Sequence, residues 1–126
     1  MAHLVLSIGS EKNWSIAQQL ISSKMFTHVY VITDHFGKTH YEPPEIAGVN
    51  VTLLVLDFAQ DASTLIEELS HGLKESFTED KVMDLDIAVN ITSGDGVHHA
   101  VLLASVLKAG FGLRIVDFSH GKVREL

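Results

Sequence analysis

Short apolar runs that do not alternate with polar residues constrain the fold of this chain more than any other feature. Each run is a few residues long and rich in Val, Ile and Leu, and stretches of mixed polarity separate the runs. A strand that is apolar on both faces is typical of a parallel sheet that is covered on both sides. We therefore expect strands of this kind at His3–Ile8, Val29–Thr33, Val49–Leu56, Leu85–Ile91 and Leu113–Phe118.

Apolar residues recur at helical spacing between several of these runs. The pattern predicts helices from Asn13 or Lys12 to Ser23, after an N-cap at Asp61, and over Val97–Ala109. Because strands and helices alternate, we expect the helices to cover both faces of the sheet. The segment Asp34–Gly48 is expected to be the longest irregular stretch, and long loops are often functional.

The end of the chain predicts a change of strand direction. The turn Ser119–Gly121 is too short for the crossover that parallel strands need, so Lys122–Glu125 should return as an antiparallel strand. A length of 126 residues fits one domain. The expected fold is a Rossmann-like three-layer α/β sandwich, with a mainly parallel sheet and a C-terminal antiparallel β-hairpin, over a single domain of residues 1–126.

Composition and charge exclude several kinds of site and partner. The chain has no cysteine, which excludes disulfides, thiolate metal sites and cysteine nucleophiles, and which fits a reducing cytoplasm. Nine Lys and Arg against sixteen Asp and Glu give a formal net charge of −7, so we expect no direct DNA binding by this domain. No apolar run approaches the ~20 residues of a membrane helix, and the first residues lack the basic region of a signal peptide. We expect a cytoplasmic protein that does not bind membranes.

Two loops are the candidates for ligand binding. In open parallel sheets, ligands bind beyond the carboxyl ends of the strands, next to the point where the strand order reverses. The loops after the first and fourth predicted strands should flank that point, and they combine glycines with hydroxyl, amide and basic groups. The candidate residues are Gly9, Ser10, Lys12, Asn13, Thr92, Ser93, Gly94, Asp95, Gly96 and His98.

The first of these loops has a simpler interpretation as well. It matches neither the G-x-G-x-x-G fingerprint nor the P-loop. It could be an ordinary turn that Ser10 or Asn13 caps, with Trp14 packed inward.

The histidines do not predict a metal site. The chain has eight, but no pair has the H-E-x-x-H spacing. His98 and His99 are adjacent on a predicted helix, so their side chains should point about 100° apart. We assign no metal ligand, no cofactor and no catalytic residue from the sequence.

The segment Asn90–Gly94, the Ala- and Leu-rich helix after it and the ending Gly112–Phe118 with its hairpin resemble the CRISPR-associated Rossmann fold (CARF) sensor family. The resemblance implies a homodimer that binds a cyclic oligoadenylate, or a similar nucleotide second messenger, across its interface. It also implies control of an effector, such as a transcriptional regulator or a nuclease. The family's basic residue at the helix start is absent, because Gly96 and Val97 stand there and His98 is the nearest substitute.

Two other functions stay open at this point. The domain could be a ring nuclease that cleaves the same cyclic messenger, with Lys12 or His98 stabilising the developing charge. It could also be a Rossmann-like domain that serves dimerisation alone.

The helix over Val97–Ala109 is more apolar than a helix that covers one sheet face needs to be. We expect the surplus apolar surface, with Val101, Leu102, Val106 and Leu107, to be buried against a second copy of the chain. Ser105 and Lys108 would then lie at the margin of a two-fold interface. The alternative is that the Asp34–Gly48 segment or the hairpin covers this helix.

Overall fold

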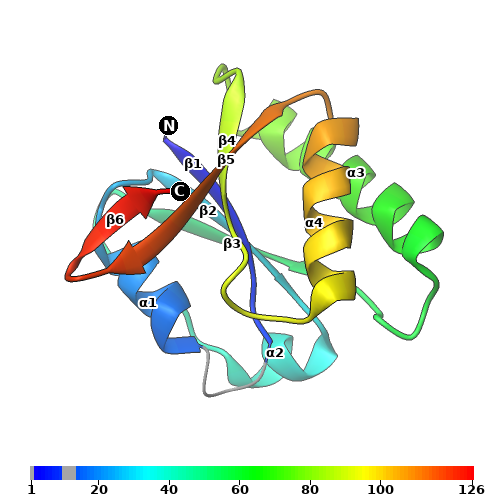
Figure 1. Cartoon of the computed structure of the whole chain (residues 1–126), viewed down its shortest axis with the longest axis horizontal. Helices are drawn as coiled ribbons and strands as arrows, with labels where there is room; N and C mark the ends of the chain where they lie inside the picture. Colours follow the sequence, from blue (N-terminus) through cyan, green and yellow to red (C-terminus); the bar gives the residue numbers. More distant parts are fainter. Residues whose placement is uncertain (1, 10–13) are drawn as a thin grey trace.

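A computed structural model describes residues 2–9 and 14–126 of the chain. Its centre is a six-stranded sheet in the order β3-β2-β1-β4-β5-β6 (Figure 1). The strands are β1 His3–Ser7, β2 His28–Thr33, β3 Asn50–Val55, β4 Asp86–Asn90, β5 Gly112–Ser119 and β6 Lys122–Glu125. The helices are α1 Trp14–Ser22, α2 His35–His40, α3 Ala62–Glu79 and α4 Gly96–Lys108.

Strand β1 lies at the centre of the sheet. It pairs in parallel with β2 on one side, where Leu4 is opposite Val29, and with β4 on the other, where Leu4 is opposite Ala88. The strand order therefore reverses between β1 and β4, as the sequence predicts. β5 and β6 pair in an antiparallel hairpin, with Val116 opposite Glu125. The predicted Rossmann-like sandwich with a C-terminal hairpin is confirmed.

The sheet buries a separate apolar cluster on each face, because successive strand residues point to opposite sides. Leu4 and Leu6 of β1 pack with Leu20 of α1 on one face. Val5 between them packs with Leu69 of α3 and the apolar side of α4 on the other. Figure 1 shows α3 and α4 side by side on one side of the sheet and α1 on the opposite side.

The segment predicted as irregular contains a short helix, α2, so that expectation was wrong at its start. The Asp34 carboxylate accepts a hydrogen bond from the amide of Gly37 at 2.9 Å and caps the helix. Gly37 also lets the helix lie against β2, because a Cβ at this position would come within 1.8 Å of Oγ1 of Thr33. A six-residue helix of this kind depends on a cap and a close tertiary contact, not on an apolar stripe.

The surroundings of α4 correct the predicted dimer interface. Val101, Leu102 and Val106 belong to the core of this chain. Ser105 is 0% exposed, and its hydroxyl lies 3.5 Å from the carbonyl oxygen of Ile66 on α3. Ser105 is therefore not at the margin of an interface, because α3 covers this side of the helix. Within the chain, α4 packs against α3, β1 and β5, and most closely against α3.

Helix α3 is the longest of the described helices and has a mixed surface. Leu65, Leu69 and Leu73 face the core, whereas Glu67 and Glu68 are exposed. In the described part of the chain, no helix combines the length and the apolar character needed to cross a bilayer.

Candidate functional site

A cavity of about 370 Å³ opens at the carboxyl ends of β1, β2 and β4. Its volume lies within the range of small-molecule sites. It occupies the position beside the reversal of strand order at which open α/β sheets bind ligands. We call it the switch-point pocket, and its lining residues are Ile8, Gly9, Asp34, Phe58, Gly94, Asp95 and His98.

The loops after β1 and β4 meet backbone to backbone at the floor of this pocket. A Cβ on Gly9 would lie 2.8 Å from the amide nitrogen of Gly94, so a side chain at Gly9 would push the loops apart. Gly94 has a φ of +95°, a conformation that side chains disfavour. The indole Nε1 of Trp14 donates a hydrogen bond to the carbonyl oxygen of Gly9 at 3.2 Å. The close approach of Gly9 and Gly94 holds the two loops together, and the Trp14 hydrogen bond ties the end of β1 to the start of α1.

A buried hydroxyl lies beneath this contact. Ser7, the last residue of β1, is 2% exposed, and its Oγ has no hydrogen-bond partner among the described residues. A Cβ on Gly94 would lie 3.6 Å from this oxygen, so the hydroxyl faces the loop after β4. An unpaired buried hydroxyl is unusual, because it loses its hydrogen bonds to water.

Asp95 is the N-cap of α4, and its carboxylate contacts both the backbone and the ring of His98. The Asp95 carboxylate accepts the backbone amide of His98 at 3.0 Å and is 2.6 Å from Nδ1 of the His98 ring. At 2.6 Å from a carboxylate oxygen, Nδ1 carries the proton and donates it. The other ring nitrogen, Nε2, is then the basic atom of the neutral side chain. The His98 ring also packs on Phe58, with 4.1 Å between the ring centroids.

These contacts change the expected role of the α4 N-terminus. The amides of a helix start can hold an anionic ligand, but here the carboxylate of Asp95 itself accepts the amide of His98. The hydrogen bond from the His98 ring, and then that from the amide, lower the pKa of Asp95 from 3.8 to about 2. Asp95 is therefore charged at neutral pH and adds negative charge to the pocket.

We expect a titration of the Asp95 carboxyl, followed by NMR, to give a pKa of about 2. The pKa of Asp95 is lower in the folded chain than its ordinary value of 3.8, so the contact stabilises the fold fully at pH values above 3.8. This stabilisation is lost as the pH falls toward about 2. His98→Ala removes the largest cause, so the pKa of Asp95 should rise but stay below 3.8. Asp61, which caps α3 without a histidine partner, is the control, and its pKa should not change. An unchanged pKa of Asp95 in His98→Ala would contradict the contact.

The remaining residues of the loop after β4 hold its shape. The side chain of Asn90 donates hydrogen bonds to the Thr92 hydroxyl at 3.0 Å and to the carbonyl oxygen of Val116 at 2.9 Å. Nε2 of His99 lies 3.1 Å from the backbone carbonyl oxygen of Ser93. The residue Ser93 is buried. This network fixes the turn that carries Gly94 and Asp95 to the pocket.

The structure brings part of the predicted site together. Gly9, Gly94, Asp95 and His98 line the switch-point pocket. Thr92, Ser93 and Gly96 belong to the same loop but do not line it, and Ser10, Lys12 and Asn13 lie outside the described residues. Ile8, Asp34 and Phe58 line the pocket and were not predicted. Asp34 could have been found, since it directly follows the last residue of β2.

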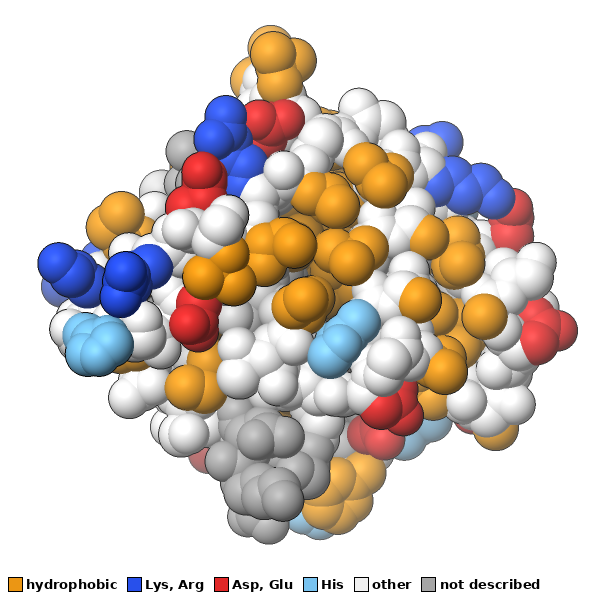
Figure 2. All heavy atoms as spheres, in the orientation of Figure 1, with side chains coloured by type: hydrophobic (Ala, Val, Ile, Leu, Met, Phe, Trp, Pro, Cys, Tyr) orange, Lys and Arg blue, Asp and Glu red, His pale blue; other side chains and the backbone are white. Residues whose placement is uncertain are grey.

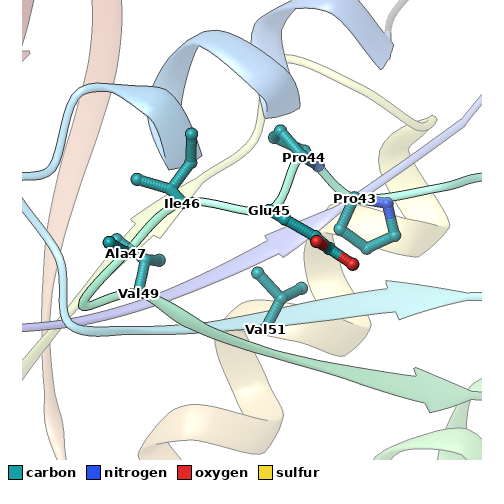
Figure 3. Close-up of a pocket in the computed structure, with 7 residues that line it drawn as sticks. All are labelled: Pro43, Pro44, Glu45, Ile46, Ala47, Val49 and Val51. Atoms are coloured by element: carbon teal, nitrogen blue, oxygen red, sulfur yellow. The ribbon is translucent and has the colours of Figure 1, made fainter.

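A larger hollow lies at the amino end of β3, away from the switch point. It has a volume of about 620 Å³ and is lined by residues of the segment before β3 and of its start (Figure 3). Glu45 is the one ionisable side chain among the seven that line it, and most of the others are apolar. A ligand site usually has several polar groups that converge on one point. The switch-point pocket has such groups and this hollow does not.

The chemistry of the switch-point pocket is acidic and aromatic. Asp34 and Asp95 bring two carboxylates, His98 brings an imidazole, and Phe58 brings an apolar ring. Among residues 2–9 and 14–126, no lysine or arginine lines it. The pocket therefore offers more hydrogen-bond acceptors than positive groups. Comparison of the chain with protein-family models and with curated proteins gives no match.

Proposed function

We propose that this chain is a ligand-sensing domain that binds a cyclic oligoadenylate, or a similar nucleotide second messenger, in the switch-point pocket. The observation that carries the proposal is the meeting of the loops after β1 and β4, at Gly9 and Gly94, beside the reversal of strand order. This is the place at which open α/β sheets bind nucleotides. Phe58 and His98 add flat rings of the kind on which a base can stack.

The proposal includes a homodimer, because one pocket of about 370 Å³ has room for one unit of such a ring and not for all of it. Figure 2 shows hydrophobic side chains gathered at the centre of the face on which β5 and α4 lie. Large apolar residues of these two elements that stay partly or fully exposed are Val97, Leu103, Leu107, Leu113, Ile115 and Phe118. A second copy that covered this face would be related by a two-fold axis.

Leu107→Arg is expected to convert this dimer into a folded monomer. Leu107 is 55% exposed on the outer side of α4, so an arginine there meets solvent in the monomer but would be buried in the dimer. Light scattering gives the mass, and circular dichroism shows whether the fold persists. Met83→Arg is the control, because Met83 is 87% exposed in the loop before β4. Dimers that persist in Leu107→Arg would place the interface elsewhere.

Calorimetric titration with cyclic tetra-adenylate and cyclic hexa-adenylate tests the function directly. We expect binding of one ring per dimer, and its loss when Gly94 is changed. Heat from neither ring, with a folded dimer in the cell, would leave dimerisation as the role of the domain and overturn the sensor proposal.

The net charge of −7 leads us to propose that DNA contacts, if the effector makes them, come from another domain. A cytoplasmic location belongs to the same proposal.

A second candidate function, cleavage of the ring, is favoured by the Asp95–His98 contact. Nε2 of His98 could take the proton of a ribose 2′-hydroxyl while Asp95 holds Nδ1–H. The 2′-oxygen would then attack the adjacent phosphorus, and the bond from phosphorus to the 5′-oxygen would break. The products would be a 2′,3′-cyclic phosphate and a 5′-hydroxyl, which takes up a proton.

Incubation with labelled ring separates this activity from simple sensing. Cleavage by the wild-type chain that is lost in His98→Ala would support it. His71→Ala is the control, because His71 is an exposed histidine on α3 that pairs with Glu75. A ring that stays intact after long incubation would remove the second candidate and leave the first untouched.

A further inference from the structure

Asp34 is the lining residue whose role the proposed function leaves unexplained. It follows the last residue of β2 directly and lies at the same edge of the sheet as Gly9 and Gly94. One of its carboxylate oxygens, Oδ1, accepts the amide of Gly37 at 2.9 Å. A carboxylate has about four acceptor positions, so one capping bond leaves most of them available. Asp34 is exposed, and it forms no ion pair with any side chain of the described residues.

The charges of the pocket determine which part of a nucleotide can approach Asp34. Asp34 and Asp95 both line it, and the shortest bonds of Asp95 go to His98. A phosphate beside Asp34 would be repelled by the carboxylates of Asp34 and Asp95. The group that meets Asp34 must therefore be a hydrogen-bond donor. In an adenine nucleotide the donors are the ribose hydroxyls and the 6-amino group of the base.

The neighbouring residues favour the ribose over the base. Phe58 and His98 form the aromatic wall of the pocket, so the base has a surface on which to stack there. Asp34 instead follows strand β2, beside Ile8 and Gly9 at the end of β1. In dinucleotide-binding sheets, an acidic residue in the corresponding place accepts hydrogen bonds from ribose.

We propose that Asp34 binds a ribose 2′-hydroxyl, so that the switch-point pocket selects ribonucleotides over deoxyribonucleotides. The inference rests on the proposed function and adds the chemical class of the ligand to it. A hydrogen bond from a hydroxyl to a charged carboxylate changes binding by about tenfold or more. The wild-type chain should therefore bind cyclic tetra-adenylate at least about tenfold more tightly than the same ring made of 2′-deoxyadenylate.

Asp34→Asn is the test variant, because asparagine also caps helices well and keeps an oxygen for the amide of Gly37. Asp61→Asn is its matched control. Asp61 caps α3 by accepting the amide of Thr64 at 2.8 Å, and it does not line the pocket. Calorimetry with the ribose ring, the 2′-deoxyribose ring and a ribose ring whose purines lack the 6-amino group gives three affinities for each protein.

The expected result is a loss of about tenfold or more for the ribose ring in Asp34→Asn, with no change for the 2′-deoxyribose ring and no change in Asp61→Asn. An equal loss for both rings in Asp34→Asn would overturn the assignment, since Asp34 would not sense the 2′-hydroxyl. The assignment would also be overturned if Asp34→Asn and the wild-type chain bound the ring without 6-amino groups equally well. Asp34 would then contact the base. If no ring binds the wild-type chain, the proposed function itself fails. The two failures are therefore distinguishable.

Discussion

Ser105→Arg is expected to leave no folded protein. Ser105 is 0% exposed and lies where α4 packs along α3, with its hydroxyl 3.5 Å from the carbonyl oxygen of Ile66. An arginine there must either bury an unpaired charge, which costs several kcal/mol, or push the two helices apart. Either cost is of the order of the roughly 5–15 kcal/mol by which a domain is stable. Circular dichroism and size-exclusion chromatography should show an unfolded or aggregated chain.

Two controls separate the effect of the buried position from the effect of introducing an arginine. Ser105→Ala removes a long hydrogen bond but keeps the packing, so the free energy of unfolding should change by less than about 1 kcal/mol. Leu107→Arg introduces the same side chain two residues along α4, at a position that is 55% exposed, and the fold should persist. A folded Ser105→Arg would show that α3 does not cover this side of α4.

Gly94→Ala should both weaken the fold and abolish ligand binding. The φ of +95° at Gly94 strains any residue with a Cβ, and this strain costs about 1–3 kcal/mol. The added Cβ would also lie 2.9 Å from the Cβ of His98, so the ring would have to move away from the pocket. We expect a fall of about 2 kcal/mol in the free energy of unfolding, measured by urea titration, and no heat on addition of ring.

Gly96→Ala is the matched control, two residues further along the chain. Gly96 is the first residue of α4, and a Cβ there would meet nothing within 4 Å. Since alanine is the better helix former, this variant should be as stable as the wild-type chain or up to about 1 kcal/mol more stable. Equal effects of the two substitutions would contradict the distinct roles of the two glycines.

The order of strands and helices could be predicted from the sequence because it depends on local patterns. An apolar run such as Ile87–Val89 between two helical stretches has few alternatives to a central parallel strand. The short hairpin turn after Ser119 likewise permits only an antiparallel return. Helix α2 could not be predicted in this way. It depends on the fit of Gly37 against Thr33, which is a contact between elements and leaves no periodic trace in the sequence.

The pocket was predictable to the extent that its residues follow the strands directly. Gly9 and Gly94 were found because each lies in the loop after a strand next to the reversal of strand order. Phe58 reaches the pocket from the loop after β3, two strands away from β1, and only the tertiary structure brings it to His98. The place of Ser105 was missed for a related reason. Helical periodicity shows that α4 has more than one apolar side, but not that α3 covers one of them.

The pairing of β1 with β4 bears on how fast this protein folds and unfolds. The two strands are neighbours in the sheet although most of the chain lies between them, so their pairing requires the closure of a long loop. Such non-local pairings slow folding. The Gly9–Gly94 contact lies just beyond this pair and can form only after both halves of the sheet have docked. A molecule that touches both loops would therefore hold the docked halves together, and its effect would appear as a slower unfolding rate, with refolding almost unchanged.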